Sequence, residues 1–231
     1  MQEPCSTGFQ PMPRTEASWH GLKTRATWAL IILCFLPRLG VAQTDEEKYT
    51  TTIEKRVQGI LDALNLTDDA KKTKVHDILV NQYHALREWQ DANQAKLKDK
   101  TLSADEKQKI LDTRKPLHDK FIAALNEQLT PEQVDIVKDK MTYNTLHVDY
   151  RAYNQFVPNL TDEQKAKIME YLTQARDEAI DGTSQEEKAG IFKKYKGKIA
   201  NYLSAQGIDI KQATKDYMDE QKKKPTTEST K

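Results

Sequence analysis

The sequence predicts an all-α protein, a single helical domain of about six or seven helices that follows a signal peptide. Two observations predict this fold class. Apolar residues recur at the three- and four-residue spacing of one helix face through most of residues 53–222. In addition, one helix-start pattern occurs repeatedly, in which an apolar residue precedes a hydroxyl residue and then acidic or amide residues. Residues 141–158 are the exception, because their first half is poor in strong helix formers.

Residues 1–42 are expected to be a leader and signal peptide outside the fold. A flank with Lys23 and Arg25 precedes the apolar run 26–36, and small residues follow as far as Ala42. These features are typical of a secretory signal, and the run is too short to span a bilayer. Cleavage after Ala42 would leave a periplasmic or secreted protein without cysteine and without stable membrane insertion. The alternative is an uncleaved membrane anchor.

The domain is expected to occupy residues 43–222, and its first half holds three amphipathic segments. The first helix is marked by an apolar stripe of Ile53, Val57, Ile60, Leu61 and Leu64. A second stripe predicts a helix over about 75–100. A third covers 110–125, where Pro116 predicts a kink or a break, because proline lacks the N–H donor and clashes with the preceding turn.

The second half continues with clear helix starts and stops. A leucine followed by a hydroxyl residue and an acidic or amide first turn predicts N-caps at residues 67, 103, 130 and 161. Ser184, with Glu187 three residues later, opens a further helix. Helices are expected near residues 161–180, 184–204 and 207–222. Gly182 and Gly207 separate them as turn residues, and the tail 223–231 is expected to be disordered.

Composition and motifs argue against several classes of function. The chain has 36 Lys and Arg against 35 Asp and Glu, and this balance argues against a nucleic-acid partner. It has no Gly-rich phosphate loop, serine nucleophile elbow or Cys–His pair, so we expect no enzyme, catalytic residue or cofactor. His76 and His84 are spaced too widely for a metal pair, so no metal site is expected. Lysines in 193–198 are interpreted as a solvated helix face balanced by Glu186 and Glu187, with contact to phosphate or a membrane surface as the alternative.

The best candidate site is the aromatic segment 141–158. Tyrosine offers a flat apolar face and a hydroxyl, and nearby amide and guanidinium groups add hydrogen bonds of fixed geometry, a combination that suits a sugar ring. The predicted ligand-binding residues are Tyr143, Asn144, Tyr150, Arg151, Tyr153 and Asn154. The alternative is that Tyr150, Tyr153 and Phe156, spaced three residues apart, anchor this segment on the core.

Several stretches carry a resemblance to a known family. They are residues 64–67, 81–83, 138–143, 158–164 and 194–203, together with Val148 and Tyr150. Taken together, they make the sequence similar to the exported bacterial family named domain of unknown function 3826, over about residues 48–220. The resemblance implies sugar binding and an origin in bacteria that degrade polysaccharides. It implies no catalytic or binding residues.

A second resemblance leads to a different function. Leu129-Thr130-x-x-Gln133 and Leu160-Thr161-x-x-Gln164 are similar to the paired LTxxQ motif of small periplasmic helical chaperones. The expected function is non-enzymatic carbohydrate (polysaccharide) binding, with a glycan as the partner and the oligomeric state left open. A chaperone or adaptor for unfolded envelope proteins is the alternative. A third interpretation, an enzyme acting on a polysaccharide, would need two converging carboxylates.

Overall fold

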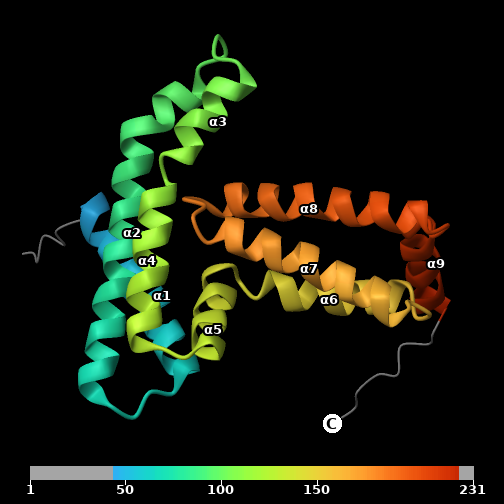
Figure 1. Cartoon of the computed structure of the whole chain (residues 1–231), viewed down its shortest axis with the longest axis horizontal. Helices are drawn as coiled ribbons and strands as arrows, with labels where there is room; N and C mark the ends of the chain where they lie inside the picture. Colours follow the sequence, from blue (N-terminus) through green and yellow to red (C-terminus); the bar gives the residue numbers. More distant parts are fainter. Residues whose placement is uncertain (1–43, 224–231) are drawn as a thin grey trace, which may run out of the picture. The chain divides into compact units, whose positions relative to one another are not determined.

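The computed structural model describes residues 44–223, and every regular element within that range is an α-helix (Figure 1). The helices are α1 (Asp45–Leu64), α2 (Asp69–Lys98), α3 (Ala104–Asp112), α4 (Lys115–Gln128), α5 (Pro131–Met141), α6 (Thr145–Phe156), α7 (Asp162–Ala179), α8 (Gln185–Ala205) and α9 (Ile210–Lys223). The all-α prediction is confirmed. The expected number of six or seven helices is wrong, since these residues form nine.

Two segments account for the additional helices. The first is the stretch 110–125, which carries a single apolar stripe in the sequence. It is divided between two helices, because α3 ends at Asp112 and Pro116 lies in the first turn of α4, where its missing N–H is tolerated. The segment after Met141 contains α6, despite its weak helix formers. One face of α6 is buried through Leu146 and Tyr153, so tertiary packing outweighs local propensity.

Most of the predicted helix starts are confirmed. A hydroxyl accepts a hydrogen bond from the backbone N–H three residues later at Ser103, Thr130, Thr161 and Ser184. Gln133 and Gln164 complete the capping boxes by accepting from the N-cap backbone N–H groups. Both LTxxQ stretches therefore begin helices. The start of α2 differs, because Asp68 rather than Thr67 is the cap.

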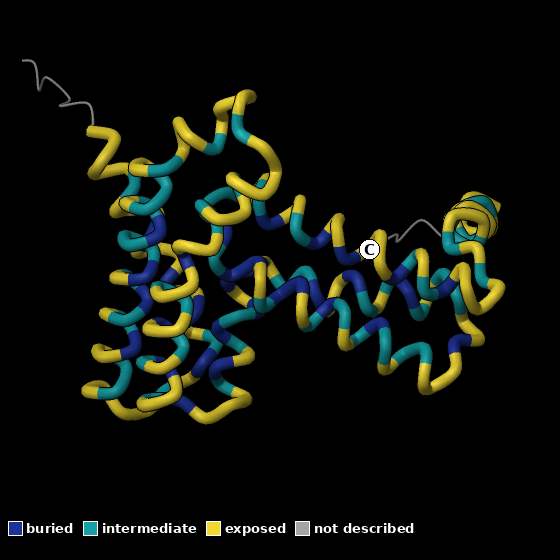
Figure 2. The backbone as a smooth tube through the Cα atoms, turned by 45° about the horizontal axis from the view of Figure 1, so that its top comes forward, coloured by how far each residue is buried: buried dark blue, intermediate teal, exposed yellow. Residues whose placement is uncertain are grey.

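Two clusters of buried apolar side chains hold the helices together. Figure 2 marks the buried residues along the backbone in dark blue. The first lies among α1, α2, α4 and α5 and includes Val57, Leu79, Leu125 and Val137. The second lies among α6, α7 and α8 and includes Ile168, Leu172, Ile199 and Leu203. In addition, α9 packs against α6 and α8. Ile180 directly follows α7 but is fully buried in the first cluster, so it ties the end of α7 to the other core.

Ion pairs also join α7 to α5. The Arg176 guanidinium lies 2.6 Å from the Asp135 carboxylate and 3.0 Å from that of Asp139. Lys138 of α5 pairs with Asp177 at 3.1 Å. The Arg176 side chain is only 6% exposed. Removing it would therefore leave the buried Asp139 carboxylate with His147, 2.8 Å away, as its remaining ion-pair partner, and is expected to destabilise the fold.

The acids that balance the predicted lysine run differ from those expected. Ion pairs join Lys194 to Glu178 at 2.9 Å and Lys196 to Asp149 at 2.8 Å. Glutamates 186 and 187 lie in the first turn of α8, away from the lysines, so their predicted role was wrong. Glu187 instead pairs with Arg114, which precedes α4.

Some predictions fall outside the described residues. They are the leader, the signal peptide, cleavage after Ala42 and all but the first residue of the predicted tail; Lys223 is the last residue of α9. Within residues 44–223, no helix is both long enough and apolar enough to cross a membrane.

Candidate functional site

Four of the six predicted site residues lie along α6 and line neither of the two cavities described below. Tyr153 is 8% exposed and belongs to the second core, where burial raises the pKa of its hydroxyl to about 12. Tyr150 is half-buried against the same core. The Asn154 side-chain amide donates to the Tyr150 carbonyl at 2.7 Å, and Arg151 is exposed. The alternative interpretation, core anchoring, therefore describes Tyr153, and Phe156 packs on Tyr217 with ring centroids 5.3 Å apart.

The other two residues form the turn between α5 and α6. Tyr143 and Asn144 have φ angles of 59° and 55°, in the left-handed region. The Asn144 N–H donates to the Asp139 carbonyl at 2.7 Å, which holds the turn. Left-handed geometry is common for asparagine but costs a bulky residue such as tyrosine about 1–3 kcal/mol, and such strain collects at functional sites. The Tyr143 side chain is nevertheless 47% exposed, so no apolar packing explains this strain.

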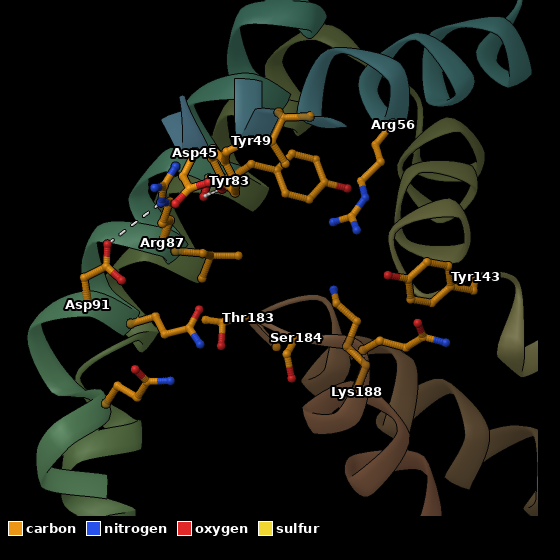
Figure 3. Close-up of a pocket in the computed structure, with 16 residues that line it drawn as sticks. Asp45, Tyr49, Arg56, Tyr83, Arg87, Asp91, Tyr143, Thr183, Ser184 and Lys188 are labelled. Atoms are coloured by element: carbon orange, nitrogen blue, oxygen red, sulfur yellow. Dashed lines mark hydrogen bonds and ion pairs between the residues drawn. The ribbon is translucent and has the colours of Figure 1, made fainter. Parts of the chain in front are cut away.

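Tyr143 lines two adjoining cavities. The first, of about 350 Å³, is bounded by α1, α2, the α5–α6 turn, the α7–α8 loop and the start of α8 (Figure 3). The second, of about 270 Å³, lies against α1, α2, α5 and α8. Four residues line both cavities, and we call them the central cluster: Arg56, Tyr83, Tyr143 and Lys188. In Figure 3 the ends of Arg56, Tyr143 and Lys188 turn toward the same space.

Lys188 is a buried cation in the wall of both cavities. It is 7% exposed, and its ammonium group donates to the carbonyls of Met141 at 3.1 Å and Ile180 at 3.4 Å. Burial, which penalises the charged form, lowers its pKa to about 8. Gly182 makes room for its stem, since a Cβ there would lie 2.8 Å from Lys188 Cγ.

Aromatic and amide groups form the remaining walls of the first cavity. The Tyr49 hydroxyl donates to the Tyr83 carbonyl at 2.8 Å, and the Arg87 guanidinium lies 4.0 Å above the Tyr49 ring. Burial raises the pKa of the Tyr83 hydroxyl to about 12, so it stays protonated at neutral pH. Uncharged polar side chains come from Gln90, Gln94, Thr183, Ser184 and Gln185. The walls therefore offer ring faces, amides, hydroxyls and cations, together with the carboxylates of Asp45 and Asp91.

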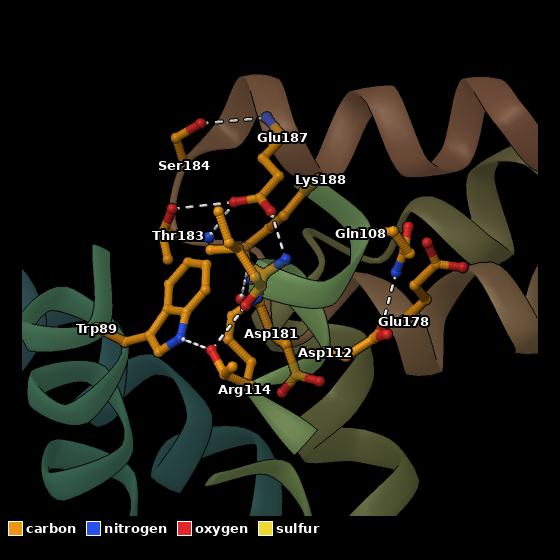
Figure 4. Close-up of polar contacts among 12 residues, drawn as sticks. Trp89, Gln108, Asp112, Arg114, Glu178, Asp181, Thr183, Ser184, Glu187 and Lys188 are labelled. Atoms are coloured by element: carbon orange, nitrogen blue, oxygen red, sulfur yellow. Dashed lines mark hydrogen bonds and ion pairs between the residues drawn. The ribbon is translucent and has the colours of Figure 1, made fainter. Parts of the chain in front are cut away.

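A network behind the first cavity fixes the α7–α8 loop (Figure 4). Arg114 donates to the Asp181 carbonyl at 2.8 Å and pairs with Glu187 at 2.7 Å. Its guanidinium also lies 4.6 Å from the centre of the Trp89 ring. Glu187 in turn accepts from the backbone and hydroxyl of Thr183, each at 2.9 Å. These bonds hold the loop that supplies one wall of the cavity.

Histidines and carboxylates form ion pairs elsewhere in the described range. His76 lies 2.9 Å from Glu54 and 3.1 Å from Asp77, and these carboxylates raise its pKa. His118 lies 2.9 Å from Asp181, which raises the pKa of that histidine. No group of three or more His, Cys, Asp or Glu within residues 44–223 is arranged to hold a metal ion.

The sequence pointed to Tyr143 but not to its partners. Arg56, Tyr83 and Lys188 come from α1, α2 and α8, and only the fold brings them together. One signal was present for Lys188. It lies four residues before Phe192, on the stripe that continues through Tyr195 and Ile199, where an apolar residue is expected.

Comparison with known proteins identifies the family. The family model described as Protein of unknown function (DUF3826) matches residues 50–223. The chain belongs to this family. The match includes the whole central cluster, whereas Asp45 and Tyr49 of the first cavity lie just before the matched region. No match was found among curated proteins.

Proposed function

We propose that this DUF3826 protein binds carbohydrate without covalent chemistry, in the first cavity beside Tyr143. The observation that carries the proposal is Tyr143, which is exposed and has a strained backbone, in the wall of a cavity that is also lined with amides, hydroxyls and charged groups of both signs. A sugar ring has apolar faces and a polar rim, so it needs this combination of an aromatic surface and oriented hydrogen-bonding groups. The sugar binding implied by the family resemblance agrees with it.

The size and openness of the site support a sugar unit as the ligand. A volume of about 350 Å³ is at the lower end of the range for small-ligand pockets, roughly 300–1,000 Å³. Arg56 is exposed and Tyr143 is nearly half exposed, so the cavity reaches solvent at this end. A short stretch of a longer glycan could enter there. We also propose that the protein is exported, on the basis of the sequence of residues 23–42 alone.

Tyr143→Ala tests the proposal against a matched tyrosine. Purified protein is screened on a glycan array, and affinities for the hits are measured by calorimetry. Tyr143→Ala is expected to weaken binding about tenfold or more, because a central aromatic contact is lost. Tyr150→Ala, on α6 outside both cavities, is the control and is expected to bind within about twofold of wild type. Equal losses in both variants, or no loss in Tyr143→Ala, would contradict this site.

The chaperone interpretation has less support on the described surface. Holding unfolded chains would need an exposed apolar patch of several hundred Å². The large exposed apolar side chains within residues 44–223 are Tyr143, Val148 and Met218, which belong to the α5–α6 turn, α6 and α9. The LTxxQ threonines and glutamines are used in capping boxes. Carbohydrate binding is therefore the function that these residues favour.

A further inference from the structure

The second cavity is lined by cations and by no acid. Its charged residues are Lys55, Arg56, Lys140 and Lys188, and its other lining side chains are uncharged. Lys188 is more than nine-tenths buried, and within the described residues no carboxylate lies within ion-pair distance of it or of Arg56. A buried cation normally has a partner, because desolvating an unpaired charge is costly. The central cluster therefore has positive charge that the described part of the chain does not neutralise.

Other cations around the first cavity are neutralised. Arg87 pairs with Glu46 at 2.9 Å, and Asp91 lies 3.8 Å from it. The two acids whose charge acts on Lys188 have other partners, since Asp181 binds His118 and Glu187 binds Arg114. The charge is thus uneven along the first cavity: balanced at the Arg87 end and positive at the Tyr143 end.

We infer that the ligand is an anionic sugar of the uronic-acid class, with its carboxylate held between Arg56 and Lys188 while its ring lies on Tyr143. This inference rests on the proposed function and specifies its ligand. An ammonium group has three donors, and the Met141 and Ile180 carbonyls use two, which leaves one for a ligand. The exposed Arg56 guanidinium adds a planar fork that matches a carboxylate.

A uronic acid matches both the cations and the aromatic and amide groups of this site. Its carboxylate is attached to the sugar ring, so an anion at Arg56 and Lys188 places the ring beside the central tyrosines. The amides of Gln90 and Gln94 then lie in the remaining part of the first cavity, where they can bind hydroxyl groups. A free inorganic anion would use the cations but not Tyr143 or the amides.

The test compares sugars that share a ring type and differ in the charge and chemistry of a substituent. The purified protein is titrated with a galacturonate oligosaccharide, its methyl ester, the corresponding neutral galactose oligomer and a sulfated form of that oligomer. We expect the carboxylate form to bind about tenfold or more tightly than its methyl ester, because esterification removes the anion. Arg56→Gln and Lys188→Met are each expected to abolish this preference. Lys74→Gln, an exposed lysine of α2 outside both cavities, is expected to keep it.

Each outcome separates the inference from the proposed function. Equal affinity for the carboxylate, ester and neutral sugars would overturn the inference and leave carbohydrate binding intact. Tighter binding of the sulfated form would overturn the assignment to a carboxylate. If none of these sugars binds and the wider glycan array is also empty, the proposed function fails. Because Arg56 is exposed, Arg56→Gln still tests the role of the cations even if Lys188→Met folds poorly.

Discussion

Lys188 occupies a helix position where an apolar side chain would be expected, and its burial has a measurable consequence for stability. In the folded protein its pKa is lowered from 10.5 to about 8, with Asp181, Arg56, Glu187 and Arg114 as the charged groups around it. The unfolded chain exposes the amine, whose pKa returns to about 10.4. Between about pH 8 and 10 the unfolded state therefore binds more protons than the folded state, so stability rises with pH.

We expect the free energy of unfolding of wild type, relative to Lys188→Met, to increase by about 1–3 kcal/mol between pH 8 and 10. The difference should be flat below about pH 7, where the amine is protonated in both states. Urea titrations followed by circular dichroism at several pH values would measure it. Lys193→Met, an exposed lysine of the same helix, is the control and should show no such trend. If the difference in free energy of unfolding between wild type and Lys188→Met were constant with pH, it would contradict the burial of the Lys188 ammonium group.

Only part of the site could be predicted from single residues. Residue type and surroundings selected Tyr143, which lines the candidate site, but the same features also selected Tyr153, which lies in the core. The two differ because Tyr143 is in a left-handed turn and Tyr153 is on the buried face of α6. Residue type carries no information about which face of a helix is buried, and that depends on where the neighbouring helices lie.

Helix caps are the elements that the sequence predicted best. A capping box needs residues only three positions apart, so its pattern is local, and Ser103, Thr130 and Thr161 all confirm it. The prediction failed where distant packing decided the outcome. The turn at Tyr143 and the helix α6 that follows depend on the burial of Leu146 and Tyr153, which no short sequence pattern records.

Thr161→Ala separates the structural role of an LTxxQ motif from a role in recognition. Its hydroxyl accepts from the Gln164 N–H at 3.2 Å and lies outside both cavities. Loss of this cap is expected to lower the free energy of unfolding by about 1 kcal/mol. Glycan affinity should be unchanged. Thr161→Ser retains the hydroxyl and is expected to retain most of the stability. A loss of ligand binding with unchanged stability would instead indicate a recognition motif.

Residues 44–223 contain two apolar cores, and Ile180 belongs to the first although it follows a helix of the second. Burying it contributes to coupling between the cores, together with the ion pairs of Arg176. The sequence predicted one helical domain and did not predict this division. Periodicity identifies the buried face of each helix, but it does not say which helices share a core.

Ile180→Ala is expected to destabilise the protein by about 2–5 kcal/mol, because it opens a cavity at a fully buried position. It should also weaken the coupling of the cores. In a chain that begins at Gln43, Trp89 is the only tryptophan and reports on the first half. In wild type we expect the unfolding transitions followed by Trp89 fluorescence and by helical circular dichroism to have the same urea midpoint. In Ile180→Ala we expect the two midpoints to differ.

Ile168→Ala is the matched control, because Ile168 is also fully buried but lies entirely within the second core. It should cost a similar amount of stability, since the cavity is of similar size. Coincident unfolding of the two signals in Ile180→Ala would contradict the linking role that we assign to this residue.

The first cavity takes its walls from α1 and α2 in the first half of the described chain, and from the α5–α6 turn, the α7–α8 loop and the start of α8 in the second half. Neither core alone holds a complete site. If the proposed recognition is to persist over evolution, the two halves must therefore be inherited together. A recombination that exchanged one half for that of a distant relative could preserve both cores and still lose the ligand.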